Sequence, residues 1–411
     1  MESVVKIFAD DTSFFSVVTD PVTSARTLNN DLRKVTEWAH QWKMSFNPDP
    51  NKQAVEVCFS RKTTKTNSPP LVFNNVPVSS QNAHKHLGII LDKKLTFDHH
   101  LKEKILKANK GIALITRVRK FVPRDSLIRI YKAFIRPHLD YGDIIYDNPT
   151  NELFCQKIES VQYRAALAIT GCFRGTSRDR LYNELGLESL RDGRWCRRLV
   201  FFYKVINGLA PTYLNNYLPQ DIDVSYNLRR PQVLHNLVSR TDRFQDSFFP
   251  YCVSKWKQLD PDITKLPYLS SFKKALFNFV RLAPATVYNI HEPFGIMLLT
   301  RLRVCFSHLR EHKFHHNFMD TIDPFCNCQT NSIETTEHYL LRCPTFTLCR
   351  LNLFDVLHKN DISLLPYNAA HLTSVLLYGD KLFCIESNRI ILRSVINYIL
   401  KSKRFDESLI S

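Results

Sequence analysis

The sequence predicts an α+β fold, in which a small antiparallel sheet with one helix comes first and helices make up most of the remaining chain. In the first 96 residues, short runs of β-branched and aromatic residues alternate with turn residues, a pattern typical of strands. From residue 97 onward, apolar residues recur at steps of three and four, which is the spacing of amphipathic helices. A chain of 411 residues suffices for roughly two to four domains, and 44% hydrophobic residues indicate a globular protein.

The first predicted element is a β-hairpin with two carboxylates at its tip. Apolar and β-branched residues fill 4–8 and 12–18 and flank Ala9, Asp10 and Asp11. Mg²⁺ takes one or two carboxylates and leaves positions for water and substrate phosphates, and a pair of such ions can stabilise both the attacking and the leaving oxygen. Because Asp-Asp is also a common turn dipeptide, a plain turn is the alternative interpretation.

A helix and several short strands are predicted between this hairpin and residue 96. Asp20 and Pro21 suit the N-cap and the first position of a helix that ends near Met44. The apolar face of this helix comprises Leu28, Leu32, Val35, Ala39 and Trp42. Strands are expected over 54–59, 71–73, 76–78 and 87–91, with a polar loop over 60–70.

Basic residues exceed acidic ones in the chain as a whole, and the excess is concentrated in one stretch. The net charge of +17 indicates a polyanionic partner. Nucleic acid is favoured over a membrane, because no run reaches the ~18 apolar residues of a spanning helix. Residues 93–136 hold thirteen Lys or Arg against three acidic residues. Such an excess favours phosphate contacts over the alternative, a basic helix face that is merely solvated.

Two helices are predicted within this basic stretch, and further helices after it. The first has an apolar face from Phe97 to Ile115, with basic side chains off that face, and the second runs from Pro123 to near Pro137. Helices are also expected over 152–203, with a break at 208–211. The polar stretch 220–245 is expected to be a loop or an irregular nucleic-acid contact. Eleven cysteines, an odd number, argue against a disulfide framework and for a reducing compartment.

A cysteine–histidine cluster is predicted near the C-terminus. Its spacing is C-x-C-x9-H-x4-C, formed by Cys326, Cys328, His338 and Cys343. Three thiolates and one imidazole complete the tetrahedral coordination of Zn²⁺, and four protein ligands indicate a structural site. The C-x-C spacing is shorter than usual for zinc, so a chance arrangement in a cysteine- and histidine-rich chain is the alternative.

A second pattern belongs to a different class of protein. His308, Glu311 and His312 match H-x-x-E-H, the signature of a zinc metalloprotease in which two histidines one helical turn apart bind the metal. The alternative is a basic helix that contacts phosphate, because Lys313, together with two more histidines, follows directly.

Several short motifs, taken together and in order, resemble the C-terminal part of the reverse transcriptase of LINE-type (non-LTR) retrotransposons, particularly the jockey-like group. In the first half they are F-A-D-D-T at 8–12, M-S-F-N-P at 44–48 followed by Lys52, and H-L-G-I-I-L-D at 86–92, which resembles a primer grip. The basic stretch at 107–120 and I-Y-K-A-F-I-R-P-H-L-D-Y-G at 130–142 resemble the thumb of that family. The segment E-T-T-E-H-Y-L-L-R-C-P at 334–344 resembles its C-terminal zinc knuckle, and 398–405 its terminus.

The resemblance implies roles for individual residues. Asp10 would be the principal Mg²⁺ ligand with Asp11 as its partner, and Lys52 would offset charge near the leaving pyrophosphate; a solvated loop lysine is the alternative for Lys52. The thumb would clasp the RNA template and DNA primer through Lys102, Lys104, Lys107, Lys110, Arg117, Arg119 and Lys120. The structural Zn²⁺ would be bound by Cys326, Cys328, His338 and Cys343.

The resemblance also implies a domain organisation. Residues 1–96 would be a partial palm, 97–210 a basic helical thumb, 211–320 a helical or irregular connector, 321–346 the zinc knuckle and 347–411 a helical tail. In the family, the first metal-binding Asp and the fingers precede the F-A-D-D hairpin, so a chain that begins at Met1 is expected to be a C-terminal fragment that is inactive alone. We expect it in the nucleus and cytoplasm, away from membranes. The alternative is a non-catalytic zinc-containing protein that binds nucleic acid.

Overall fold

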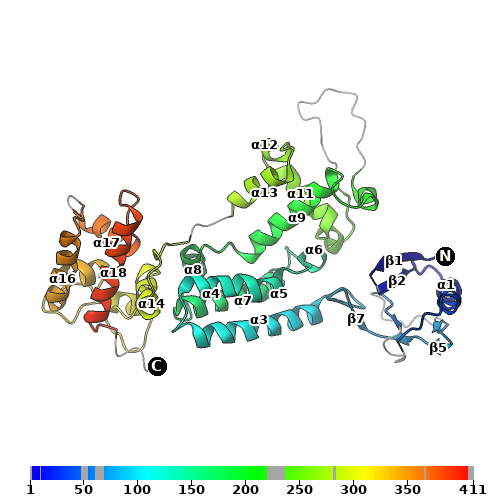
Figure 1. Cartoon of the computed structure of the whole chain (residues 1–411), viewed down its shortest axis with the longest axis horizontal. Coiled ribbons are helices and arrows are strands. Elements are labelled where there is room, and N and C mark those ends of the chain that lie inside the picture. The colour runs from blue at the N-terminus through cyan, green and yellow to red at the C-terminus, as the bar shows by residue number, and fades with distance from the viewer. Residues whose placement is uncertain are drawn as a thin grey trace. The chain divides into compact units, whose positions relative to one another are not determined.

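The structure is a computed structural model that describes residues 2–9, 11–47, 54–60, 69–219, 237–280, 284–364 and 367–405. The chain divides into two compact units, Met1–Lys104 and Ile105–Ser411 (Figure 1). Among the described residues, every strand of two or more residues belongs to the first unit, and the second unit is built from helices. The predicted α+β class is confirmed at this level.

The strands of the first unit form four separate two-stranded sheets. The strands are β1 (Val4–Phe8), β2 (Asp11–Phe15), β3 (Val55–Glu56), β4 (Val72–Phe73), β5 (Val76–Pro77), β6 (Ser79–Ser80), β7 (Ala83–His86) and β8 (Ile89–Asp92). Three pairs are antiparallel and the β3–β6 pair is parallel. The prediction of one antiparallel sheet is therefore wrong for the described residues. Four of the eight strands are only two residues long, and each strand pairs with a single neighbour.

The N-terminal hairpin and the helix after it form as predicted. Strands β1 and β2 pair in antiparallel register from Val4↔Phe15 to Phe8↔Asp11. Helix α1 (Pro21–Gln41) begins after Asp20, whose carboxylate accepts a hydrogen bond from a backbone N–H of the first turn. The apolar side of α1 packs on β4 and the residues around it.

Asp31, a buried residue of α1, binds the start of the hairpin to this helix through hydrogen bonds. Its Oδ2 accepts hydrogen bonds from the backbone N–H groups of Glu2 and Ser3, at 2.9 and 2.8 Å. Burial alone would raise the pKa of Asp31, but the hydrogen bonds from Ser3 and Glu2 lower it to about 2. The carboxylate is therefore ionised at neutral pH and stabilises the attachment of β1.

Helix α3 (Asp98–Val118) begins at the end of the first unit, and the helices of the second unit follow it. They are α4 (Arg124–Ile130), a π turn (Tyr131–Ile135), α5 (Arg136–Asp140), α6 (Asp143–Tyr146), α7 (Glu152–Thr170), α8 (Arg178–Leu185), α9 (Leu190–Ile206), a 3-10 turn (Thr212–Tyr217), α10 (Asp242–Gln245), α11 (Phe248–Gln258), α12 (Pro261–Thr264), α13 (Leu269–Asn278), α14 (Pro293–Arg303), α15 (Arg310–His315), a π turn (His338–Arg342), a 3-10 turn (Pro344–Phe346), α16 (Thr347–Lys359), α17 (Ala369–Tyr378) and α18 (Ile385–Lys401). The predicted break at 208–211 separates α9 from the turn after it. Residues 220–236 of the predicted loop, with Arg229 and Arg230, lie outside the described residues.

The second basic helix continues past Pro137, where it was expected to end. A π turn precedes the proline, and the N–H of Arg136 donates to the carbonyl of Tyr131. This wider turn changes the hydrogen-bond pattern at the point where Pro137 cannot donate an N–H. The helical path therefore reaches Asp140.

An ion-pair network holds this region against α9. Arg194 pairs with Asp147 at 2.8 Å, and Arg197 pairs with Asp140 and Asp143 at 2.8 and 2.6 Å. The R-P-H-L-D-Y-G segment and the residues directly after it therefore supply carboxylates that bind arginines of α9.

The last third of the chain shares one hydrophobic cluster. Its buried members run from Val287 to Phe405 and include residues of α14, α16, α17 and α18. Tyr339, Leu340 and Cys343 belong to the same cluster. The segment with the cysteine–histidine motif is thus packed together with the C-terminal helices, across the predicted divisions at 320 and 346.

Candidate metal centre and nucleic-acid surface

Part of the predicted palm site can be located. Asp11 is the first residue of β2, is exposed, and pairs with Phe8 next to the two-residue tip. The tip residue Ala9 has φ +52, a conformation that a tight hairpin turn requires. Asp10 and Lys52 lie outside the described residues. The Mg²⁺ site therefore stays a prediction, and Asp11 lies in strand β2 beside the tip instead of at the tip itself.

The segment that resembles a primer grip, 86–92, forms the turn and the second strand of the β7–β8 hairpin. Leu87 and Gly88 form its turn, with φ +45 and +79. After β8, the carboxylate of Asp92 accepts hydrogen bonds from the backbone N–H groups of Thr96 and Phe97, at 3.0 and 2.7 Å. Asp92 therefore shapes the turn that leads into α3, a role that the motif alone did not reveal.

The predicted nucleic-acid-binding residues differ in how exposed their side chains are. Lys102, Lys107, Lys110, Arg117 and Lys120 are exposed, and Arg119 is half-buried. Lys104 is only 9% exposed, so it is poorly placed to reach a phosphate. The exposed residues lie on α3 and on the turn after it.

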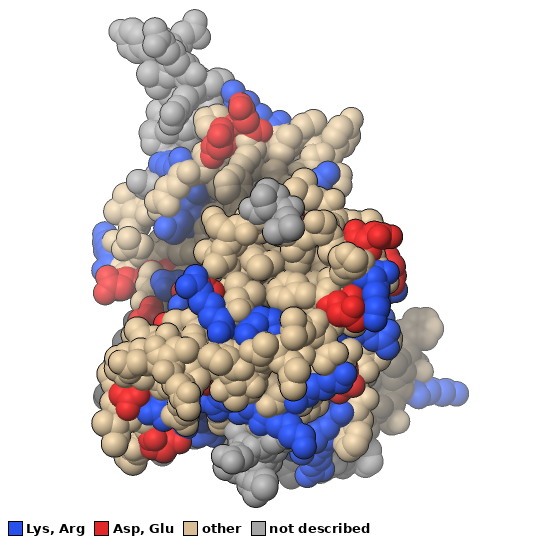
Figure 2. All heavy atoms as spheres, turned by 90° about the vertical axis from the view of Figure 1, so that its left-hand side faces the viewer, with Lys and Arg blue, Asp and Glu red and all other residues tan. Residues whose placement is uncertain are grey.

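Two other arginines of the basic stretch are held inside the protein. Arg124 is 5% exposed and pairs with Glu184 at 2.6 Å. Arg136 pairs with Asp140 and Glu188, at 2.8 and 2.9 Å. The positive charge available to a partner is therefore smaller than the sequence count indicates, and it lies mainly along α3. On the face shown in Figure 2, which carries the C-terminal helices, basic side chains lie among acidic ones and a wide uncharged area.

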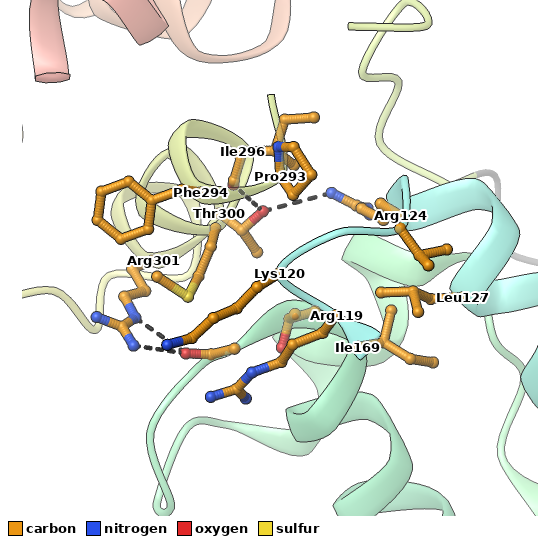
Figure 3. Close-up of a pocket in the computed structure, with 14 residues that line it drawn as sticks. Arg119, Lys120, Arg124, Leu127, Ile169, Pro293, Phe294, Ile296, Thr300 and Arg301 are labelled. Atoms are coloured by element: carbon orange, nitrogen blue, oxygen red, sulfur yellow. Dashed lines mark hydrogen bonds between the residues drawn. The ribbon is translucent and has the colours of Figure 1, made fainter. Parts of the chain in front are cut away.

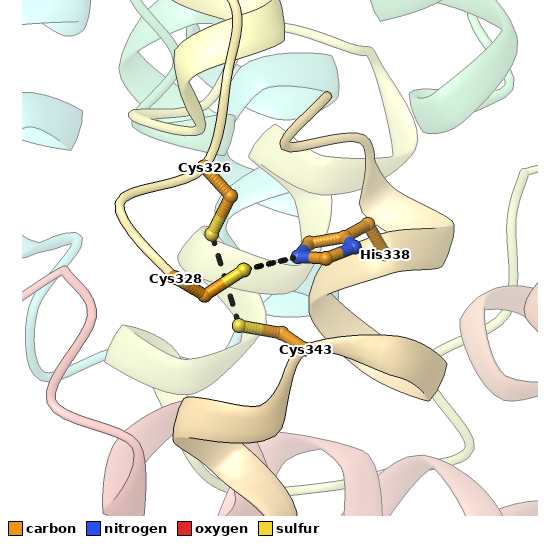
Figure 4. Close-up of side chains that lie close together, drawn as sticks. All are labelled: Cys326, Cys328, His338 and Cys343. Atoms are coloured by element: carbon orange, nitrogen blue, oxygen red, sulfur yellow. Dashed lines mark hydrogen bonds between the residues drawn. The ribbon is translucent and has the colours of Figure 1, made fainter. Parts of the chain in front are cut away.

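The cysteine–histidine motif converges on one point (Figure 4). The ligand atoms of Cys326, Cys328, His338 and Cys343 all lie within 4.8 Å of one another. The Sγ atoms of Cys326 and Cys343 are 3.7 Å apart, and Sγ of Cys328 is 3.3 Å from Nε2 of His338. A tetrahedral zinc site holds two sulfur ligands about 3.8 Å apart and a sulfur and nitrogen about 3.5 Å apart. The four side chains could therefore bind a metal ion, and three sulfurs with one nitrogen suit Zn²⁺.

Local backbone structure explains this convergence. Cys326 and Cys328 lie in a short hairpin closed by an antiparallel bridge between Phe325 and Ile333. On an α-helix, His338 and Cys343 would point about 140° apart, because each residue turns the helix by about 100°. They instead flank a π turn, in which the Cys343 N–H donates to the His338 carbonyl at 2.7 Å. The wider turn brings both side chains to the same side.

The thiols of the cluster differ in acidity. The hydrogen bond with Thr330 lowers the pKa of Cys328 to about 6, although burial opposes this shift. Burial raises the pKa of Cys326. A bound cation would favour the thiolate at both positions.

Hydrogen bonds and a ring contact connect the residues around the cluster with α15, with α18 and with the segment after α18. Buried Glu334 accepts two hydrogen bonds of 2.7 Å from Arg404, one at each carboxylate oxygen, and a third from the N–H of Arg310. The rings of Tyr339 and Tyr398 pack edge to face, and the Tyr398 hydroxyl donates to the Tyr339 carbonyl. The sequence offered no local signal for these contacts, which join residues 24, 59 and 70 positions apart.

The H-x-x-E-H residues are not brought together as metal ligands. Helix α15 begins at Arg310, so His308 precedes the helix that carries His312. His312 Nδ1 lies 2.8 Å from Ser307 Oγ, while His308 stacks on a phenylalanine ring. Burial lowers the pKa of both histidines to about 4, which keeps them neutral. Among the described residues, the Cys/His cluster is the only group close enough to hold a metal, so the metalloprotease alternative is not supported.

Sequence comparison identifies the class of protein that this chain resembles: RNA-directed DNA polymerases of transposable elements. The particular relatives include the probable polymerase from transposon X-element, 26% identical over 194 residues, and that from transposon BS, 26% identical over 200 residues. A third is the polymerase from mobile element jockey, 27% identical over 177 residues; all three are from Drosophila melanogaster. The predicted resemblance to non-LTR retrotransposon polymerases is confirmed.

These matches cover part of each chain. They span 46%, 46% and 41% of this chain, and 21%, 21% and 18% of the X-element, BS and jockey proteins. The aligned part is therefore about a fifth of each relative's length. No family model matches the chain, and no solved structure matches it.

Proposed function

We propose that the chain acts as the C-terminal part of an RNA-directed DNA polymerase of a non-LTR retrotransposon, and that it binds the RNA template and DNA primer. The similarity to the X-element, BS and jockey polymerases carries this proposal. An enzyme of that kind uses divalent metal ions and works on RNA and DNA. The exposed basic side chains of α3 support a thumb-like role, since phosphate contacts position a duplex without reading its sequence.

The metal ions have separate roles in this proposal. Asp10 and Asp11 would contribute to a Mg²⁺ site, and Lys52 would offset charge near the leaving pyrophosphate. Zn²⁺ at the Cys/His cluster would be structural, since all four coordination positions come from the protein.

A reducing compartment, the cytoplasm or the nucleus, fits the eleven cysteines, all of which have free thiols. Of the helices that the structure describes, none has the length and apolar character needed to cross a membrane.

Neutralising the exposed lysines of α3 is expected to weaken nucleic-acid binding and its salt dependence. The test variant replaces Lys102, Lys107 and Lys110 with glutamine, because Lys104 is buried. If each lysine neutralises one phosphate, the slope of log K against log salt should fall by roughly 3 for duplex DNA. Fluorescence anisotropy with an RNA–DNA duplex at several salt concentrations measures this slope.

The matched control removes the same charge elsewhere on the exposed surface. Lys273, Lys274 and Lys381 are exposed, and replacing all three with glutamine should leave most of the slope intact. Equal losses in both triple variants would mean that binding is not concentrated on α3. A slope near zero in the unmodified protein would reject phosphate-driven binding altogether.

A polypeptide of these 411 residues is expected to show only background polymerase activity. By the family resemblance, the third metal-binding carboxylate and the nucleotide-binding fingers come from segments before the F-A-D-D hairpin, and seven residues precede Phe8 here. Primer extension on poly(rA)–oligo(dT) with Mg²⁺ or Mn²⁺ tests this, with a complete reverse transcriptase as positive control. Robust extension that Asp10→Asn abolishes would contradict the prediction.

A further inference from the structure

A pocket of about 190 Å³ lies at the end of the basic helix α3 (Figure 3). Its walls come from the turn after α3, the start of α4, the end of α7 and most of the length of α14. The volume is below the roughly 300 Å³ at which pockets for drug-sized ligands begin, so the pocket would enclose part of a ligand of that size.

The walls of this pocket combine apolar and cationic side chains. Leu127, Ile169, Ile296 and Met297 contribute apolar surface. Arg119, Lys120 and Arg301 contribute positive charge, and none of the fourteen lining residues is acidic. A ligand that matches this lining has an apolar face and an anionic group.

The positive charge of Arg301 is not neutralised by a carboxylate of the described part of the chain. Arg301 is 8% exposed, and its Nε and Nη2 atoms both donate to the Gly171 carbonyl, at 3.0 and 2.7 Å. Its guanidinium lies 4.0 Å from the centre of the Phe173 ring. Burial lowers the pKa of Arg301 to about 10, and the charge of Arg119 acts in the same direction. An anion in the pocket would relieve this electrostatic cost.

The fourth cation of the pocket is different. Arg124 is neutralised by Glu184 at 2.6 Å and also lies 3.4 Å from Thr300 Oγ1. It therefore contributes to the wall and not to the uncompensated charge. None of the described carboxylates forms an ion pair with Arg119, Lys120 or Arg301.

The pocket lies just past the C-terminal end of helix α3, whose exposed basic residues precede it in the chain. Lys107, Lys110 and Arg117 are three and seven residues apart and lie on one side of the helix, over about 15 Å of its length. Arg119 and Lys120 follow directly at the pocket rim. A strand whose phosphates follow this side of α3 would bring its end to the pocket.

We propose that the pocket binds one unstacked nucleotide at the end of a nucleic-acid strand. Its phosphate lies at Arg119, Lys120 and Arg301, and its base packs against the apolar walls. This inference rests on the proposed nucleic-acid binding of α3, because the basic helix guides the strand to the pocket. Contacts of this kind are tolerant of sequence, since every base has an apolar face.

The test uses 12-nucleotide single strands that carry the fluorescent base 2-aminopurine at the 5′ end, in the middle, or at the 3′ end. Emission from one end position should rise on binding, because the base leaves the stack, while the middle position changes little. The variant Arg119→Gln/Lys120→Gln should weaken the binding affinity measured from this emission by at least about tenfold, as expected for lost charge-assisted contacts. Both residues are on a surface turn, and an unchanged unfolding midpoint would establish that the variant folds.

Two control variants separate the pocket from general charge effects. Lys273→Gln/Lys274→Gln removes the same charge from two exposed residues of α13 and should keep the end signal. Arg301→Lys keeps the positive charge but loses the pair of hydrogen bonds that Arg301 donates to the Gly171 carbonyl. The emission change at the strand end should therefore fall, while the slope of log K against log salt stays the same.

The outcomes distinguish this inference from the proposed function. Salt-dependent binding of the strand without an emission change at either end would overturn the pocket and leave nucleic-acid binding by α3 standing. Equal changes at end and middle would overturn the end-specific role. Free 2-aminopurine nucleoside monophosphate that binds as tightly as the strand would assign the pocket to a free nucleotide instead. If no strand binds at all, both proposals fall.

Discussion

Replacing Cys343 with serine is expected to release one zinc ion per chain and to destabilise the C-terminal helices. Cys343 is fully buried, and it belongs to the hydrophobic cluster that also contains residues of α16, α17 and α18. Metal binding at such a site contributes directly to folding, because the unfolded chain has no preformed site. A loss of several kcal/mol should lower the melting temperature of this part of the protein by roughly 10 °C.

The measurement combines elemental analysis with thermal unfolding, with and without a chelator. Chelation of the unmodified protein should reproduce the melting temperature of the variant. Cys349→Ser is the matched control, because Cys349 packs against the same hydrophobic cluster but is not a member of the metal-binding group. Metal affinity should also fall as the pH is lowered, because protons compete for the thiolates.

Two results would contradict the zinc prediction. One is the absence of zinc from protein prepared under reducing conditions without chelator. The other is a full equivalent of zinc in the Cys343→Ser variant, which would mean that the metal lies elsewhere.

The site that could be predicted best from the sequence is the one whose geometry is local. All four residues of the Cys/His cluster fall within 18 positions, so their spacing already indicated a shared site. The spacing did not reveal the π turn that brings His338 and Cys343 to one side, because that backbone conformation has no simple residue signature. It also did not reveal the packing of the cluster on α18, which depends on residues far along the chain.

The first unit shows the same limit in its strands. The N-terminal hairpin was predictable because β-branched and aromatic runs flank its turn. Strand β7 was not, since Ala83, His84, Lys85 and His86 show neither apolar alternation nor β-branched residues. Only pairing with β8 makes this segment a strand, and pairing is a tertiary property.

Charge counting located the basic helix but overestimated its available charge. Arg124 and Arg136 look like solvent-exposed cations in the sequence, yet their carboxylate partners Glu184 and Glu188 lie 60 and 52 positions away. A single sequence carries no information about such distant pairs. Distinguishing a phosphate contact from a buried ion pair therefore needed the structure.

Replacing Glu184 with glutamine is expected to be among the most destabilising single changes in the second unit. Glu184 on α8 lies between two arginines, Arg124 of α4 at 2.6 Å and Arg303 of α14 at 2.9 Å. The three side chains are at most 5% exposed, so this Arg–Glu–Arg triad joins three helices inside the protein. Removing the central carboxylate leaves two buried cations without a counter-charge, which typically costs about 3–5 kcal/mol.

The size of this loss separates a buried triad from an ordinary ion pair. Glu152 pairs with Arg191 at 3.3 Å with both side chains more than half exposed, so Glu152→Gln should cost at most about 1 kcal/mol in the same urea-unfolding experiment. A triple variant, Glu184→Leu with Arg124→Met and Arg303→Met, should recover much of the loss, because apolar side chains of similar size need no counter-charge.

If Glu184→Gln costs no more than Glu152→Gln, water or another group must compensate the two arginines. If the single variant is costly and the triple variant is equally so, the triad acts mainly by shape. Recovery in the triple variant would instead show that the cost of Glu184→Gln comes from uncompensated charge, and that the carboxylate is needed because two arginines meet there.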